Sequence, residues 1–237
     1  MLALITLTLV CVLTYSIEIT FGLAGTILML MVMSLVFQTK TLVVYSVLPQ
    51  ILVGVIGLVR SPRTVDARYL ARMLAFATLG AFAGLYLFYA FSASLFQVLL
   101  ASAVTGFGLY MVLAPAGVRI GPSLARVLDT LAGASQALFG ISGPIAMTRL
   151  LGTFDEKVVV RNYALAFFLC LNLFRAGGYL VHGTITQEIW QMMAFSAPFL
   201  AVALWFANHL HFRVNEAVFR RVVAWLILGG GVSLYFH

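Results

Sequence analysis

Two ionisable residues stand inside long apolar stretches of this chain. Arg175 lies in Leu171-Asn172-Leu173-Phe174-Arg175-Ala176, and Glu18 follows an apolar run that begins at Leu2. A charge inside a membrane segment is costly and is a candidate for function by default. Arg175 is a candidate to bind an anion or to pair with an acid, and the alternative is that it snorkels to the outer membrane surface. Glu18 is a candidate to carry a coupling proton, with Asp129 as a weaker one.

A glycine-broken stretch occurs twice, starting at residues 21 and 139 and thus 118 residues apart: Phe21-Gly22-Leu23-Ala24-Gly25-Thr26 and Phe139-Gly140-Ile141-Ser142-Gly143-Pro144. Glycine tolerates the positive φ of a tight turn. Thr26 is expected to cap the helix that follows the first break, and Pro144 suits the first turn of a helix after the second. The free N–H groups and positive dipole ends of two such helices predict a site for a small anion.

The candidate binding residues are the members of these two breaks and the polar or charged residues near them. They are Gly22, Gly25, Thr26, Gln136, Gly140, Ser142, Gly143, Pro144, Asn172 and Arg175. Ser135, Asn162 and Gln50 are further candidates to line a cavity, although such residues more often form interhelical hydrogen bonds. The alternative for the glycines is close helix packing, which we prefer for Gly80 and Gly84.

The composition indicates whether the helices that position these residues lie in water or in a membrane. Hydrophobic residues make up 63% of the chain and charged residues only 9%, against about 25% charged residues in a soluble domain. The apolar runs are long enough to cross a hydrocarbon core. The sequence therefore predicts an all-α polytopic membrane protein with no soluble domain, no P-loop, no metal site and no cofactor. The net charge of +7 is expected in loops at one membrane face, not in a nucleic-acid site.

The apolar segments repeat one plan in each half of the chain: a broken segment followed by three plain spans. We expect repeat 1 at 1–118 and repeat 2 at 119–237. The broken segments are 2–37 and 123–152, and the plain spans are 41–59, 69–90, 94–114, 158–181, 190–208 and 217–236.

The positions of lysine and arginine favour one topology over another. If each broken segment crosses the membrane, the basic residues divide six against seven between the two faces. If each is a re-entrant hairpin, twelve fall on one face and only Lys40 on the other. The positive-inside rule prefers the hairpins. Each repeat then makes three crossings, so the halves are expected to be inverted repeats whose hairpin tips meet at the midplane. Both termini are expected to be periplasmic.

The layout and three stretches resemble the TauE/SafE sulfite exporter family, also called the toluene-sulfonate uptake permease family. The stretches are Phe21–Met29, Ala132-Gly133-Ala134-Ser135 and Phe139–Met147. The family's glycine-rich stretch is richer in glycine and is followed by proline; here the first copy has Ala24 and no proline, whereas the second keeps Gly143-Pro144. The resemblance implies transport of sulfite, sulfonates or related small sulfur-containing anions, driven by an ion gradient, across a bacterial inner membrane.

These observations together predict a secondary transporter for a small sulfur-containing anion. We expect proton-coupled export by alternating access, with Glu18 as the coupling residue. The alternatives are a passive channel and an uptake permease for another small anion. A membrane-embedded enzyme ranks lowest, because no clustered His, Asp or Cys is visible. The expected partners are the anion and the lipid bilayer, and a homodimer stays open.

Overall fold

The computed structural model describes residues 1–21, 24–59, 64–113, 119–209 and 216–236. This part of the chain is almost entirely helical and contains no strand. Six segments are long and apolar enough to cross a membrane, and they include α1 and the consecutive pair α3–α4. The helices are α1 Leu2–Phe21, α2 Gly25–Met33, α3 Thr39–Tyr45, α4 Val47–Val59, α5 Ala67–Ala90, α6 Ala93–Leu113, α7 Pro122–Phe139, α8 Gly143–Leu151, α9 Lys157–Val181, α10 Gln187–His209, α11 Glu216–Ser233 and the short η1 Leu234–Phe236.

Both predicted breaks are present, and both contain a left-handed residue. The first break separates α1 from α2, and Ala24 in it has φ 81°. The second separates α7 from α8, and Gly140 in it has φ 74°. The left-handed region is open to glycine and unfavourable for alanine. Pro144 is the second residue of α8, where its missing N–H needs no partner.

A third break, which the sequence analysis did not predict, divides the plain span 41–59 into α3 and α4 at Ser46. Pro49 explains it, because a proline inside a helix removes one backbone hydrogen bond and clashes with the carbonyl four residues earlier. The Ser46 hydroxyl donates to Val43 O at 2.7 Å. The Val43 carbonyl also accepts a hydrogen bond from Arg175. The Val43 carbonyl, just before the break, is therefore a backbone acceptor inside the bundle.

Glycines let several helices approach closely. A Cβ on Gly80 would overlap the Thr130 carbonyl, and one on Gly84 would overlap the Ala134 carbonyl, so α5 and α7 touch backbone to backbone. The packing role expected for Gly80 and Gly84 is confirmed. Gly108 likewise lets α6 approach the α11 backbone. Small residues at helix contacts are the usual means of close packing in membranes.

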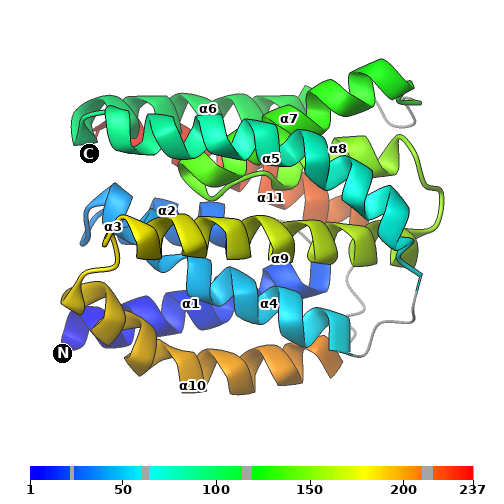
Figure 1. The fold of residues 1–237 in the computed structure, drawn as a ribbon. Coiled ribbons are helices and arrows are strands. Elements are labelled where there is room, and N and C mark those ends of the chain that lie inside the picture. The colour runs from blue at the N-terminus through cyan, green and yellow to red at the C-terminus, as the bar shows by residue number, and fades with distance from the viewer. Residues whose placement is uncertain (22–23, 60–63, 114–118, 210–215, 237) are drawn as a thin grey trace.

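The helices lie along one common direction, and the two broken segments enter the bundle from opposite ends (Figure 1). The chain starts at the left of the view, and α2 leads back to α3 at that same end. In contrast, α7 starts and α8 finishes at the right. Elements that carry most of the described basic residues begin or end at the right, whereas α3, which carries Lys40, begins at the left.

Candidate functional site

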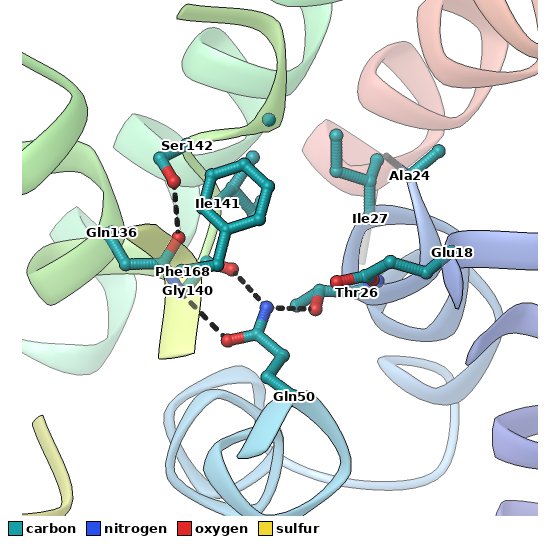
Figure 2. A pocket seen from close by; sticks show the side chains of 11 residues that line it. Glu18, Ala24, Thr26, Ile27, Gln50, Gln136, Gly140, Ile141, Ser142 and Phe168 are labelled. Atoms are coloured by element: carbon teal, nitrogen blue, oxygen red, sulfur yellow. Dashed lines mark hydrogen bonds between the residues drawn. The ribbon is translucent and has the colours of Figure 1, made fainter. Parts of the chain in front are cut away.

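A small cavity lies between the two breaks. It is lined by residues of both breaks, together with Gln50 from α4 and Phe168 from α9 (Figure 2). Its volume is about 20 Å³, which is room for a single water molecule. The lining residues are Glu18, Ala24, Thr26, Ile27, Gln50, Gln136, Gly140, Ile141, Ser142, Gly143 and Phe168.

Gln50 joins the two breaks across this cavity. Its amide nitrogen donates to Gly140 O at 2.8 Å and to the Thr26 hydroxyl. Its amide oxygen accepts from Gln136 Nε2 at 2.8 Å and from Arg175 at 3.1 Å. Figure 2 shows the side chain between the Gln136–Gly140 side and the Thr26–Glu18 side. One neutral side chain thus touches both tips and the buried cation.

Gln136 and Asn172 extend this network. Gln136 Nε2 also donates to Asn172 Oδ1 at 3.0 Å, and the Ser142 hydroxyl donates to Gln136 Oε1 at 2.6 Å. Asn172 Oδ1 accepts from Arg175 Nη1 at 2.8 Å, while its amide nitrogen donates to Phe168 O at 2.9 Å. The network thus joins Gln136 and Ser142 at the second break to Asn172 and Arg175 on α9.

Arg175 is fully buried, with none of its surface exposed. Besides Gln50 and Asn172, its guanidinium donates to Val43 O at 2.9 Å and to the Tyr179 hydroxyl at 3.4 Å. Its Nε has no hydrogen-bond partner. Snorkelling to the membrane surface is therefore wrong for this residue, because the side chain is held inside by carbonyl and amide oxygens.

No carboxylate neutralises Arg175 within the described ranges. The two ion pairs found there join Arg119 to Asp155 at the surface and Arg149 to Asp129 between the limbs of the second broken segment. No ion pair joins Glu18 to Arg175 in these ranges. A buried cation without a counter-charge is costly unless hydrogen bonds or a bound anion compensate it.

The amino end of α2 is already occupied by a carboxylate. Thr26 N–H donates to Glu18 Oε2 at 3.1 Å, and a Cβ on Gly25 would overlap the same carboxylate. The helix has Ala24 as its N-cap residue, without a side-chain cap from that residue. The expectation that Thr26 caps this helix is therefore wrong. Glu18 binds the N–H groups instead, and the Thr26 hydroxyl contacts Gln50 and Tyr15.

The structure brings most of the predicted site residues together. Thr26, Gln136, Gly140, Ser142, Gly143 and Glu18 line the cavity. Gly25, Asn172, Arg175 and Pro144 adjoin it in the chain or through the network, and Gly22 lies outside the described residues. Asn162 does not belong to the site, because it donates to Thr64 Oγ1 at 2.8 Å. Within the described ranges, no three of His, Cys, Asp and Glu form a group that could hold a metal ion.

Gln50 and Val43 are the residues whose importance the sequence underestimated. Gln50 stood only among the cavity candidates, and Val43 was absent because its contribution is a backbone carbonyl. Pro49 was the available signal for the break at Ser46, but it does not point to the Val43 carbonyl.

Comparison with known proteins identifies the family of the chain. A family model described as sulfite exporter TauE/SafE matches residues 7–234 of the 237-residue chain. Curated proteins and solved structures give no match. The matched range includes both breaks, the residues that line the cavity and Arg175. The chain therefore belongs to the TauE/SafE sulfite exporter family, a family of membrane transporters.

Proposed function

We propose that this protein is a secondary transporter that exports a small sulfur-containing anion, sulfite or an organosulfonate, through the cavity between the two breaks. The observation that carries this proposal is Arg175, a fully buried guanidinium with no carboxylate partner in the described chain. The function is transport and not catalysis. The family assignment supports the class of substrate.

The charge of Arg175 favours an anion over a cation or a neutral solute. Taking a guanidinium out of water costs several kcal/mol, and neutral acceptors return only part of it. An anion in the adjoining cavity would compensate the remaining charge through Gln50, whose amide oxygen accepts from Arg175. The amino end of α8 lies on the same wall, and its positive dipole end favours negative charge.

The size of the cavity supports alternating access rather than an open pore. Room for one water molecule is too small for an ion made of one sulfur and three oxygen atoms. The tips must therefore separate to admit the anion. Entry of the two broken segments from opposite ends is the arrangement expected of inverted repeats, here 1–118 and 119–237, which rock around a central site.

The orientation follows from the same arrangement. We assign the end rich in basic residues to the cytoplasm, by the positive-inside rule, in a bacterial inner membrane. Both termini then face the periplasm, since both chain ends lie at the opposite end of the bundle. We assign the coupling proton to Glu18, which lines the cavity and has 7% of its surface exposed.

Uptake into proteoliposomes tests the proposal. The screen compares sulfite, methanesulfonate and thiosulfate, with and without a pH gradient. We expect saturable flux of at least one anion, accelerated by the gradient. Flux that neither saturates nor responds to the gradient would indicate a passive channel, and absence of flux for all three would contradict the substrate class.

Variants of the buried arginine identify the site in this assay. Arg175→Gln removes the charge and is expected to lower flux about 10- to 100-fold, which corresponds to the loss of one or two charge-assisted hydrogen bonds. Arg126→Gln is the matched control, because Arg126 is exposed on α7. Equal flux in both variants would show that Arg175 is not required for transport.

A further inference from the structure

The Glu18 carboxylate holds the position that an incoming anion would take at the first break. It lines the cavity, and it accepts the Thr26 N–H at 3.1 Å at the amino end of the nine-residue helix α2. In Figure 2 the carboxylate lies against Thr26, across Gln50 from Gly140. The amino end of α2, which the sequence predicted as a binding site for a transported anion, is thus occupied by the carboxylate of Glu18.

Few charges face Glu18. On α1 the neighbouring titratable group is Tyr15, whose hydroxyl contacts Thr26 Oγ1 at 3.2 Å. α2 carries no titratable side chain, and the contact from α4 is the neutral amide of Gln50. From α9, Arg161 donates to Ile19 O at 3.0 Å and to Asn208 Oδ1 of α10. It contacts a backbone carbonyl, and no ion pair with Glu18 is found in the described chain.

A second feature of the same wall points to an external anion. Gln50 contacts Thr26 on one side and Arg175 on the other, and Arg175 keeps an unpartnered, buried Nε. The cavity is therefore lined by the Glu18 carboxylate on the α2 side, while the Arg175 guanidinium lies behind the lining and contacts the Gln50 amide. No ion pair joins Glu18 to Arg175 in the described chain, so the charge of Arg175 favours an anion in the cavity, across Gln50.

The geometry points to Glu18 as a built-in competitor of the transported anion: the anion takes the Thr26 N–H only when Glu18 is protonated and withdraws. The proton comes from the aqueous side to which the cavity is open, and it binds a carboxylate oxygen. The neutral acid then gives up the N–H groups, which the anion accepts. After the anion leaves, Glu18 releases the proton and returns. One proton therefore moves with each anion in the same direction, so export is driven by the anion's own outward gradient, and a gradient that is acidic outside drives uptake in the proteoliposome assay.

This inference rests on the proposed function and adds a mechanism of coupling to it. A merely structural cap would also accept the Thr26 N–H, and neutralising it would affect stability alone. Competition instead makes anion affinity depend on pH. Above the titration of Glu18, affinity is expected to fall about tenfold for each unit of pH, because one proton must be bound for each anion.

Equilibrium binding of methanesulfonate and thiosulfate to the purified full-length protein, measured across pH, tests the competition. Neither probe changes its charge over the range used, so any pH dependence belongs to the protein. The variant is Glu18→Gln, whose neutral amide imitates the protonated acid and cannot titrate. The control is Glu188→Gln, at an exposed carboxylate at the start of α10. Thermal unfolding of both variants checks that they are folded.

We expect wild type and Glu188→Gln to lose affinity with rising pH, and Glu18→Gln to bind with an affinity independent of pH. At the alkaline end the variant should bind at least about tenfold more tightly than wild type. In proteoliposomes the number of protons moved per transported anion should fall from about one in wild type to none in Glu18→Gln. A pH dependence unchanged in folded Glu18→Gln, or loss of its binding at every pH, would overturn the competition and leave the transport function standing. Absence of binding and flux in wild type would instead overturn the proposed function, and this inference with it.

Discussion

Replacing Gly140 by alanine is the sharpest structural perturbation of the second break. Gly140 ends α7 with φ 74°, its N–H donates to Gln136 O at 2.8 Å, and its carbonyl accepts from Gln50 at 2.8 Å. A Cβ at this position would lie 3.0 and 3.2 Å from the two terminal nitrogens of Arg175 and 3.1 Å from Ser46 Oγ. The substitution therefore strains the backbone and presses on the buried cation at once.

Two costs add up in Gly140→Ala. A left-handed conformation costs a residue with a Cβ about 1–2 kcal/mol. Arg175 is held by four hydrogen bonds and cannot retreat without weakening one, and a hydrogen bond to a charged group contributes about 1.5–3 kcal/mol. A destabilisation of about 3 kcal/mol follows, which lowers Tm by roughly 6–12 °C in a chain of this length.

Thermal unfolding in detergent at one fixed scan rate measures this effect. Ala24→Gly is the matched variant, since Ala24 holds a left-handed conformation at the first break and has a side chain to lose. Its strain is relieved, while the unfolded chain gains freedom, so we expect a Tm equal to or slightly above that of wild type. If Gly140→Ala melted within about 1 °C of wild type, the left-handed turn against Arg175 would be wrong.

Three further predictions concern the surrounding helices. Gly80→Ala should destabilise the protein by about 3 kcal/mol or more, because the added methyl group meets a backbone carbonyl of α7. Gly106→Ala is the control: a methyl group there would have nothing within 4 Å, so the Tm should be unchanged or slightly higher. Lys40→Met should cost about 1–2 kcal/mol, since the ammonium donates to two carbonyls at the end of α5 at 2.6 and 2.8 Å; a Tm equal to that of wild type would mean that these bonds add nothing. Asp129→Ala should destabilise the protein by about 3–5 kcal/mol, because it leaves the buried Arg149 without a counter-charge. Adding Arg149→Met should recover part of that loss in a double-mutant cycle. Additive effects of the two substitutions would show that the pair is uncoupled.

Much of the scaffold could be predicted because its causes are local. Both breaks coincide with glycines in otherwise apolar runs, and Pro144 marks the first turn after the second break. The membrane class follows from composition alone. Arg175 and Gln136 stood out because a charge and an amide are rare at such depth.

The partners of these residues could not be predicted, since they depend on contacts between distant segments. The Val43 carbonyl accepts from Arg175 because α9 packs beside this part of the chain, a contact between segments 132 residues apart. The cap on α2 comes from Glu18, eight residues before the N–H that it accepts. A carboxylate one turn before a break does not reveal by sequence whether it faces the helix end, the cavity or Arg175.

Locating a bound anion tests the central claim most directly. Selenite, the heavier analogue of sulfite, can be placed in crystals of the protein by its anomalous signal. The account predicts one ordered peak between the two breaks, within hydrogen-bond distance of Gln50 and beside the amino end of α8. Anomalous density found only among the surface arginines, with the space between Thr26 and Ser142 empty at saturating selenite, would contradict it.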